Sequence, residues 1–281
     1  MCVDFNSSSP TVIHVIPQGS AVGGVTSLGD DVFVLRGNIQ RKIEVYDTDT
    51  FTLQRHITVP RLSIRSFGLA ACPHNNRLYA SDYDNDSVHR VELSGSNAVM
   101  KWSVGRCPVG LSVNSEHNLL VVSRDESKLQ IFTTDGTLLQ NIQLQADIEY
   151  PWHAVQLPTG QFLVSHRGSL HGVSLVGAKG AVVRSYGGQK GSQLTQMNGP
   201  AGLAADREGR FLVADQKNRL LVIDQSLSSA HEMSVCVDGG LKGPYCLWYD
   251  QSCRRLYIGE WSGRVIVIDN LKDFTATQVS A

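Results

Sequence analysis

The side chains best suited to chemistry in this chain are three carboxylates and one histidine. Asp82, Asp215 and Glu260 each end a short apolar segment, and His153 stands inside another, PWHAV. Hard divalent cations prefer carboxylate oxygens, so a fold that gathered these residues would hold a cation able to activate water. The alternative is structural: in a turn such as VADQKNR, the carboxylate accepts hydrogen bonds from backbone N–H groups of its own loop. The turn composition favours the structural interpretation.

A second group of residues combines arginines with aromatic side chains, which are suited to binding a partner. Guanidinium groups and exposed rings stack on the bases of single-stranded RNA, and they also anchor protein interfaces. A third interpretation is that the charges only solvate loops while the rings fill the centre of the fold. The residues in question are Arg36, Arg65, Arg124, Arg167, Arg219, Arg264, Phe67, Trp152, Tyr245 and Trp261.

An internal repeat must position both groups, because the same pattern recurs six times. Each unit begins with an apolar strand, such as SFGLAAC (66–72) or PAGLAA (200–205), and equivalent residues recur every 42 to 49 positions. A second, a third and a weaker fourth strand follow, separated by polar turns with Gly and Pro. Four strands at this period are typical of a β-propeller blade. We therefore predict an all-β, six-bladed β-propeller of four-stranded antiparallel blades.

The ring of blades must also close. The sixth unit has three strong strands, ending with VIVID (265–269), whereas TVIHVIP (11–17) precedes the first unit. We expect residues 11–17 to supply the missing outer strand, because closure removes an exposed sheet edge. The tail FTATQVS (274–280) also has the pattern of an outer strand, and the sequence leaves the choice open. Residues 11–281 are predicted to form a single propeller after a polar leader, residues 1–10.

One face of such a propeller collects the links between blades and the turns from second to third strand; it is called the loop face below. The arginines and aromatic residues fall on this face, which carries 14 basic and 10 acidic residues. The four chemical candidates fall at the mouth of the central channel. Acidic residues gather in the second and third units, where they would repel an RNA backbone. This favours a protein or peptide partner over single-stranded RNA.

The histidines and cysteines do not form the pattern of a zinc site. Of nine histidines, only His153, His166 and His171 fall near the channel, all in one blade, which cannot easily surround a tetrahedral ion. The six cysteines include no Cys-x-x-Cys pair, and residues 1–10 lack the features of a secretory signal. We therefore expect free thiols, a cytoplasmic location, and no metal or other cofactor.

Charge and hydropathy argue against two further classes of partner. The chain has 25 Lys+Arg and 26 Asp+Glu, a net charge of −1, which is not typical of a DNA-binding protein. No apolar run approaches the roughly 18 residues that a membrane-spanning helix needs. We expect no DNA and no membrane partner.

Two units resemble a known repeat. The segment GPAGLAADREGRFLVADQKNRLLVID (199–224) has the Pro-x-Gly entry, the Asp-x-x-Gly turn and the Val-Ala-Asp…Asn-Arg core of the NHL repeat. The segment SFGLAACPHNNRLYASDYDNDSVHRVEL (66–93) matches it closely. The chain is thus similar to the six-bladed NHL propeller of tripartite-motif (TRIM-NHL) proteins. The resemblance implies a rigid platform for protein or RNA, without ligase activity, because this chain has no Cys/His cluster of a RING or B-box module.

A divalent-metal-dependent lactonase of the senescence-marker/gluconolactonase type is the alternative. Those six-bladed enzymes bind a cation in the channel through ligands that come partly from first strands. The six first strands, as the repeat delimits them and with PYCLWY (244–249) as the sixth, contain no acidic residue and no Asn. We therefore predict a non-catalytic recognition scaffold with no catalytic residue.

Overall fold

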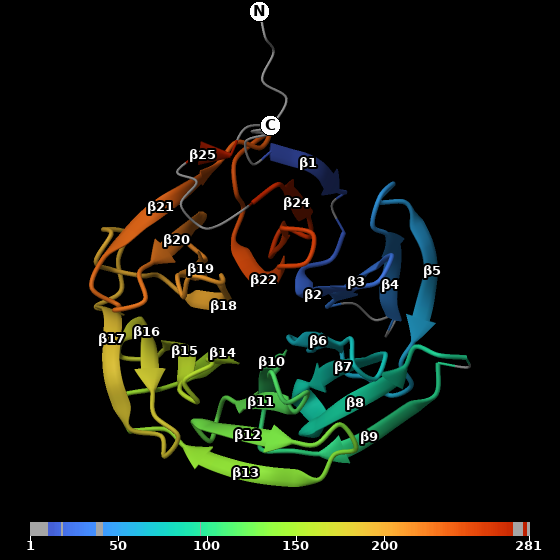
Figure 1. Ribbon diagram of the computed structural model, residues 1–281, viewed down its shortest axis with the longest axis horizontal. Coiled ribbons are helices and arrows are strands. Elements are labelled where there is room, and N and C mark those ends of the chain that lie inside the picture. Colours follow the sequence, from blue (N-terminus) through green and yellow to red (C-terminus); the bar gives the residue numbers. More distant parts are fainter. Residues whose placement is uncertain (1–10, 18, 38–41, 96, 272–277, 280–281) are drawn as a thin grey trace, which may run out of the picture.

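Six β-sheets are arranged in a ring about a central axis (Figure 1). The structure is a computed structural model that describes residues 11–17, 19–37, 42–95, 97–271 and 278–279. Its described residues contain no α-helix, and their one helical turn is a 3-10 turn, η1 (Tyr83–Asn85). The all-β, six-bladed β-propeller predicted from the repeat is confirmed.

The first three blades follow one another along the chain, each from the channel outwards. Blade one contains β2 (Val22–Leu28), β3 (Asp31–Arg36), β4 (Lys42–Asp47) and β5 (Leu53–Thr58). Blade two contains β6 (Leu69–Cys72), β7 (Arg77–Asp82), β8 (Ser87–Glu92) and β9 (Val99–Ser103). Blade three contains β10 (Pro108–Val113), β11 (Leu119–Ser123), β12 (Lys128–Phe132) and β13 (Leu138–Gln143).

The last three blades continue this order, except that blade six takes its outer strand from the start of the chain. Blade four contains β14 (Pro151–Gln156), β15 (Phe162–Arg167), β16 (His171–Val176) and β17 (Val182–Gly188). Blade five contains β18 (Pro200–Ala205), β19 (Phe211–Asp215), β20 (Arg219–Ile223) and β21 (Ala230–Val235). Blade six contains β22 (Pro244–Asp250), β23 (Arg255–Glu260), β24 (Val265–Asp269) and β1 (Thr11–Ile16).

The two chain ends occupy the outer edges of neighbouring blades. β1 pairs antiparallel with β24, with Thr11 opposite Asp269 and Ile16 opposite Val265, as expected for residues 11–17. The short β25 (Gln278–Val279) pairs in parallel with β21 of blade five. The second candidate for the outer strand therefore adds to blade five; its residues 274–277 and 280 lie outside the described part of the chain.

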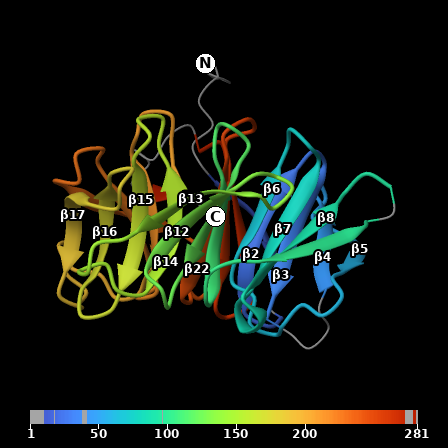
Figure 2. The ribbon, with the colours of Figure 1, turned by 90° about the horizontal axis from the view of Figure 1, so that it is seen from below.

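The blades are held together by apolar clusters between their faces. Middle strands such as β24 are almost wholly buried because a neighbouring blade covers each of their faces. Each of the six interfaces between adjacent blades has its own cluster of buried side chains. At the junction of blades six and one, Ile16 packs with Val25, Val34, Tyr257 and Val267. Figure 2 shows the blades from the side, with strands crossing the thickness of the ring.

Glycine near the start of the first strand allows the blades to approach closely at the channel. A Cβ atom on Gly202 would lie 2.7 Å from the backbone nitrogen of Leu247 in the next blade. Gly24, Gly68 and Gly110 occupy the equivalent position of their blades and are equally crowded by the next first strand. Blade four has His153 at this position instead of a glycine.

The described part of the chain also bears on two composition-based expectations. Its five cysteines are all free thiols. The described residues form no helix that is long and apolar enough to cross a membrane.

Candidate functional site

Arg167, at the end of β15, lies over the indole ring of Trp152, the second residue of β14. The guanidinium carbon is 3.7 Å from the ring centroid, which is a close cation–π contact. Within the described residues, no acidic side chain forms an ion pair with Arg167. Burial lowers the pKa of Arg167, the Tyr245 hydroxyl opposes that shift, and the nearby Arg124 adds to it. The guanidinium stays charged at neutral pH, so it is a partly desolvated cation without a counterion among the described residues.

Trp152 belongs to an aromatic cluster that fills the channel on this side. Trp152 is 5% exposed and Tyr245 is 2% exposed, and their ring centroids are 5.4 Å apart. Phe67 packs on both, at 5.4 Å from Trp152 and 6.3 Å from Tyr245. A small void of about 30 Å³ lies directly behind these rings, deeper in the channel. The interpretation that the rings fill the centre of the fold therefore holds for Phe67, Trp152 and Tyr245.

A hollow of about 340 Å³ opens above this cluster on the loop face. Trp261, in the turn after β23, forms part of its rim; it is 57% exposed and its ring centroid is 5.2 Å from that of Tyr245. The lining therefore combines a cation, buried rings and one exposed ring, which suits a ligand with both an anionic and an apolar part. The lining residues are Phe67, Trp152, Arg167, Gln216, Gly243, Tyr245 and Trp261.

Arg124 and Arg65 extend the same surface toward blades two and three. The Arg124 guanidinium lies 5.9 Å from the Trp152 ring, and its Nη1 donates to the Tyr83 hydroxyl at 2.7 Å. Its Nε is buried without a hydrogen-bond partner. Arg65 is exposed, lies 4.8 Å from the Tyr83 ring centroid and forms an ion pair with Asp84. Of these three cations Arg167 lines the hollow, whereas Arg124 and Arg65 lie on neighbouring rings outside its lining.

The other three arginines of the sequence-based group are engaged within their blades. Arg36 and Arg219 are each 6% exposed, unlike the exposed loop positions that the sequence suggested. Arg36 pairs with Glu44 at 2.6 Å, and Arg219 donates to the carbonyls of Ser192, Gln193 and Gln196. Arg264 pairs with Glu260 and donates to the carbonyls of Asp238 and Gly240. These guanidinium groups support the links between blades rather than an open surface.

The three acids at the ends of second strands are structural in the same way. Asp82, Asp215 and Glu260 are all 0% exposed. Each accepts a backbone N–H from the link that enters its own blade, from Ser63, Asn198 and Lys242 respectively. Each also pairs with a cationic or imidazole side chain on its third strand or directly before it: His89, Arg219 or Arg264. Within the part of the chain that the structure describes, no three His, Cys, Asp or Glu side chains are grouped as metal ligands.

His153 bridges three blades at the channel wall. Its Nδ1 accepts the backbone N–H of Leu203 in blade five at 3.2 Å. Its Nε2 lies 3.2 Å from the carbonyl oxygen of Leu111 in blade three, so the hydrogen bonds place the proton on Nε2. Burial lowers the pKa of His153 to about 4, and the Leu111 carbonyl only partly opposes that shift. At neutral pH it is therefore an uncharged residue that joins first strands.

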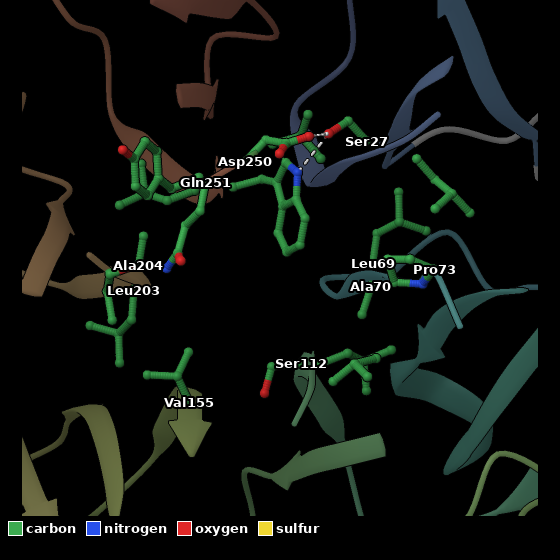
Figure 3. A pocket seen from close by; sticks show the side chains of 18 of the residues that line it. Ser27, Leu69, Ala70, Pro73, Ser112, Val155, Leu203, Ala204, Asp250 and Gln251 are labelled. Atoms are coloured by element: carbon green, nitrogen blue, oxygen red, sulfur yellow. Dashed lines mark hydrogen bonds between the residues drawn. The ribbon is translucent and has the colours of Figure 1, made fainter. Parts of the chain in front are cut away.

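A larger cavity, of about 580 Å³, occupies the opposite mouth of the channel. Figure 3 shows Leu69, Ala70, Val155 and Leu203 around it, with Ser27 and Asp250 meeting on one wall. This cavity was not predicted from the sequence, and the expectation that no first strand holds an acidic residue is wrong for blade six, because β22 extends to Asp250, which lines the cavity. Trp248 was the available signal, because it stands where the other first strands have Thr26, Ala70, Ser112, Val155 and Ala204.

Comparisons with known proteins identify the fold class. No protein-family model matches the chain, and no curated protein matches it. A structure of hydrazine synthase from Kuenenia stuttgartiensis is 16% identical, with TM-score 0.65 over 89% of this chain and 76% of that one. Virginiamycin B lyase from Staphylococcus aureus is 9% identical, with TM-score 0.65 over 93% of this chain and 99% of that one.

A third solved structure is similar to this chain in fold. A protein of unknown function from Bacteroides thetaiotaomicron is 14% identical, with TM-score 0.71 over 94% of this chain and 72% of that one. Likeness at these identities establishes the six-bladed β-propeller and leaves function to the site itself.

Proposed function

We propose that the protein is a recognition scaffold that binds a segment of a partner protein on the loop face. The observation that carries this proposal is Arg167, a partly buried cation stacked on Trp152 beside a hollow whose rim includes the exposed Trp261. A carboxylate of the partner would neutralise Arg167, and an apolar side chain would occupy the hollow. Aromatic and arginine residues in such positions are typical anchors of protein interfaces.

Exposed apolar side chains on the loop face support a protein partner. Large hydrophobic residues that are at least 39% exposed occur in the links and turns of this face, and not only on the outer strands of the blades. A protein surface buries such side chains favourably, whereas an RNA backbone offers them no apolar contact. They are Ile64, Tyr150, Leu170, Leu194 and Trp261.

The charges argue in the same direction. Arg36, Arg219 and Arg264, which RNA phosphates would need, already face carboxylates and backbone carbonyls of their own blades. The recognition role agrees with the NHL resemblance, and we propose a cytoplasmic location together with it. A lactonase mechanism receives less support, because Asp215 and Glu260 are occupied by Arg219 and Arg264.

The test begins with selection of peptides from a displayed random library on the nuclease-treated protein. The Kd of the best peptide is then measured by calorimetry for the wild type and for Arg167→Gln, Trp261→Ala and Lys217→Gln. Lys217 is an exposed cation of the loop face outside the hollow, so its variant controls for net charge. We expect Arg167→Gln and Trp261→Ala each to weaken binding at least about tenfold and Lys217→Gln to change it less than about twofold.

A parallel titration with a single-stranded RNA oligonucleotide decides between the two partner classes. Tight RNA binding with a steep salt dependence, together with no selected peptide, would overturn the proposal. Selected peptides that lack an acidic group or a free carboxylate would remove the role given to Arg167.

A further inference from the structure

The cavity at the other mouth of the channel is separate from the hollow on the loop face. It lies where first strands turn into second strands, as its lining residues Leu28, Gly29 and Pro73 show. At about 580 Å³ it falls within the usual range for small-molecule sites. The aromatic cluster of Phe67, Trp152 and Tyr245 separates it from the hollow on the loop face.

Most of its wall is apolar. First strands of five blades contribute Val25, Leu69, Leu111, Leu203 and Leu247 to the lining, and that of blade four contributes Val155. These side chains surround the channel axis, so a ligand that enters would lose most of its contact with water. The cavity therefore suits a molecule with a compact apolar or aromatic body.

One side of the cavity is polar and negatively charged. Asp250 Oδ2 accepts a hydrogen bond from Ser27 Oγ at 2.9 Å, and Ser27 Oγ in turn accepts one from Trp248 Nε1 at 2.8 Å (Figure 3). The other oxygen, Oδ1, accepts from the Ser252 hydroxyl at 2.6 Å and its N–H at 2.9 Å. These hydrogen bonds hold the carboxylate of Asp250 at the wall of the cavity, with the indole of Trp248 beside it.

No cation within the described residues neutralises that carboxylate. Arg255 is opposite Asp250 in the β22–β23 pairing, but its guanidinium binds Asp269 at 3.2 Å and the carbonyl of Thr48 at 2.7 Å. Partial burial raises the pKa of Asp250, but the hydrogen bonds from Ser252 and Ser27 outweigh that effect and lower it, so the group is ionised at neutral pH. A negative charge beside an aromatic ring is the arrangement that binds organic cations.

The surrounding turns strengthen the negative potential at this mouth. The turns that join first to second and third to fourth strands carry seven acidic and four basic residues. A cationic ligand would therefore be attracted before it reaches the cavity. The acidic residues are Asp30, Asp49, Glu116, Asp135, Asp206, Glu208 and Asp224, and the basic ones are Lys179, Arg207, Arg210 and Arg254.

We propose that this cavity binds a small organic ammonium ion with an apolar or aromatic body. Its ammonium group would donate hydrogen bonds to Asp250 and lie against Trp248, and its body would fill the space between Leu69, Leu111 and Leu203. The selectivity comes from the charge: a neutral molecule of the same shape gains the apolar contacts but not the interaction with the carboxylate.

The test compares naphthylethylammonium with naphthylethanol, its neutral counterpart, by calorimetry on the full chain at neutral pH. We expect the ammonium ion to bind at least about tenfold more tightly than the alcohol. The Asp250→Asn variant should abolish this difference and leave the Kd of the alcohol nearly unchanged. The Asp30→Asn variant, which removes an acid from the same face outside the cavity, should keep it.

Two further variants keep the proposal falsifiable if Asp250→Asn folds poorly. Val155→Trp should fill the cavity and prevent binding of both probes, and Trp248→Phe should weaken both while the melting temperature reports folding. Arg167→Gln should leave both Kd values unchanged, which separates this site from the proposed function. Equal binding of the two probes, a preference that survives Asp250→Asn, or no binding at all would each overturn the proposal.

Discussion

Asp82 and His89 share a hydrogen bond of 2.9 Å although their side chains are 0% and 1% exposed. Burial alone would raise the pKa of Asp82, but the hydrogen bonds from His89, Ser63 and Asn85 outweigh it and lower the pKa to about 2. The ionised carboxylate thus stabilises blade two, as the carboxylates of Asp215 and Glu260 do in blades five and six.

The first prediction concerns that carboxylate. Because the folded pKa lies below the unfolded value of 3.8, Asp82 contributes stability above pH 3.8, which is lost as the pH falls toward 2. A shift of this size corresponds to about 2 kcal/mol. Asp82→Asn should lower the free energy of unfolding at pH 7 by about that amount and flatten its pH dependence below pH 4. Denaturant unfolding at several pH values measures both, and the exposed Asp49→Asn should match the wild type.

A second prediction uses the neutral state of His153. Its folded pKa of about 4 lies below the ordinary value of 6.5. Its contribution is therefore complete above pH 6.5 and is lost as the pH falls toward 4, by roughly 3 kcal/mol at most. Gln can accept and donate like the neutral imidazole, so His153→Gln should reduce the slope of stability between pH 6.5 and 4. An unchanged slope in His153→Gln, or the same reduction in the exposed His56→Gln, would contradict the assignment.

The third prediction separates the two tryptophans of the loop face. Trp152 is buried against Phe67 and Tyr245, so Trp152→Ala should create a cavity and destabilise the protein by about 3–5 kcal/mol. Trp261 is 57% exposed, and Trp261→Ala should change stability by no more than about 0.5 kcal/mol. Thermal unfolding of both variants checks this. Equal losses would mean that Trp261 also supports the fold, and its use as a binding probe would fail.

The fourth prediction concerns closure of the ring by β1. Deleting residues 1–17 removes β1 and exposes the edge of β24, together with Val25 and Tyr257 at the junction with blade one. We expect a lower melting temperature and aggregation, because an unpaired strand edge templates association. Deleting only residues 1–10 keeps β1 and serves as the control. A monomeric 1–17 deletion of unchanged melting temperature would show that β1 is dispensable.

The repeat made the fold predictable, because spacing and turn residues recur in every blade. The structural role of Asp215 was also predictable, since the turn VADQKNR offers backbone N–H groups to its carboxylate. The burial of Arg36 was not, because blade one reverses the polarity: the arginine ends the second strand and Glu44 lies on the third. A sequence shows which charges are present, but packing decides which of them a neighbour has already neutralised.

The cavity beside Trp248 escaped prediction for a related reason. Its carboxylate, Asp250, follows the same pattern as turn-capping acids elsewhere in the chain, and it does cap a turn through Ser252. Its second role depends on Ser27, which is 223 positions away in sequence and adjacent only after the ring has closed. Contacts across that closing junction lie beyond what a single repeat can indicate.

The aromatic cluster of Phe67, Trp152 and Tyr245 closes the inner end of both the hollow on the loop face and the cavity at the other mouth of the channel. Each of the two is therefore a well with one opening. A molecule bound in one well can leave only by the way it entered, and it can never compete for space with a molecule in the other. Two ligands should therefore bind at the same time, one in each well. They should dissociate at two independent rates that respond to different variants. Any communication between them would have to pass through the rings as a change in their packing, without a shared ligand.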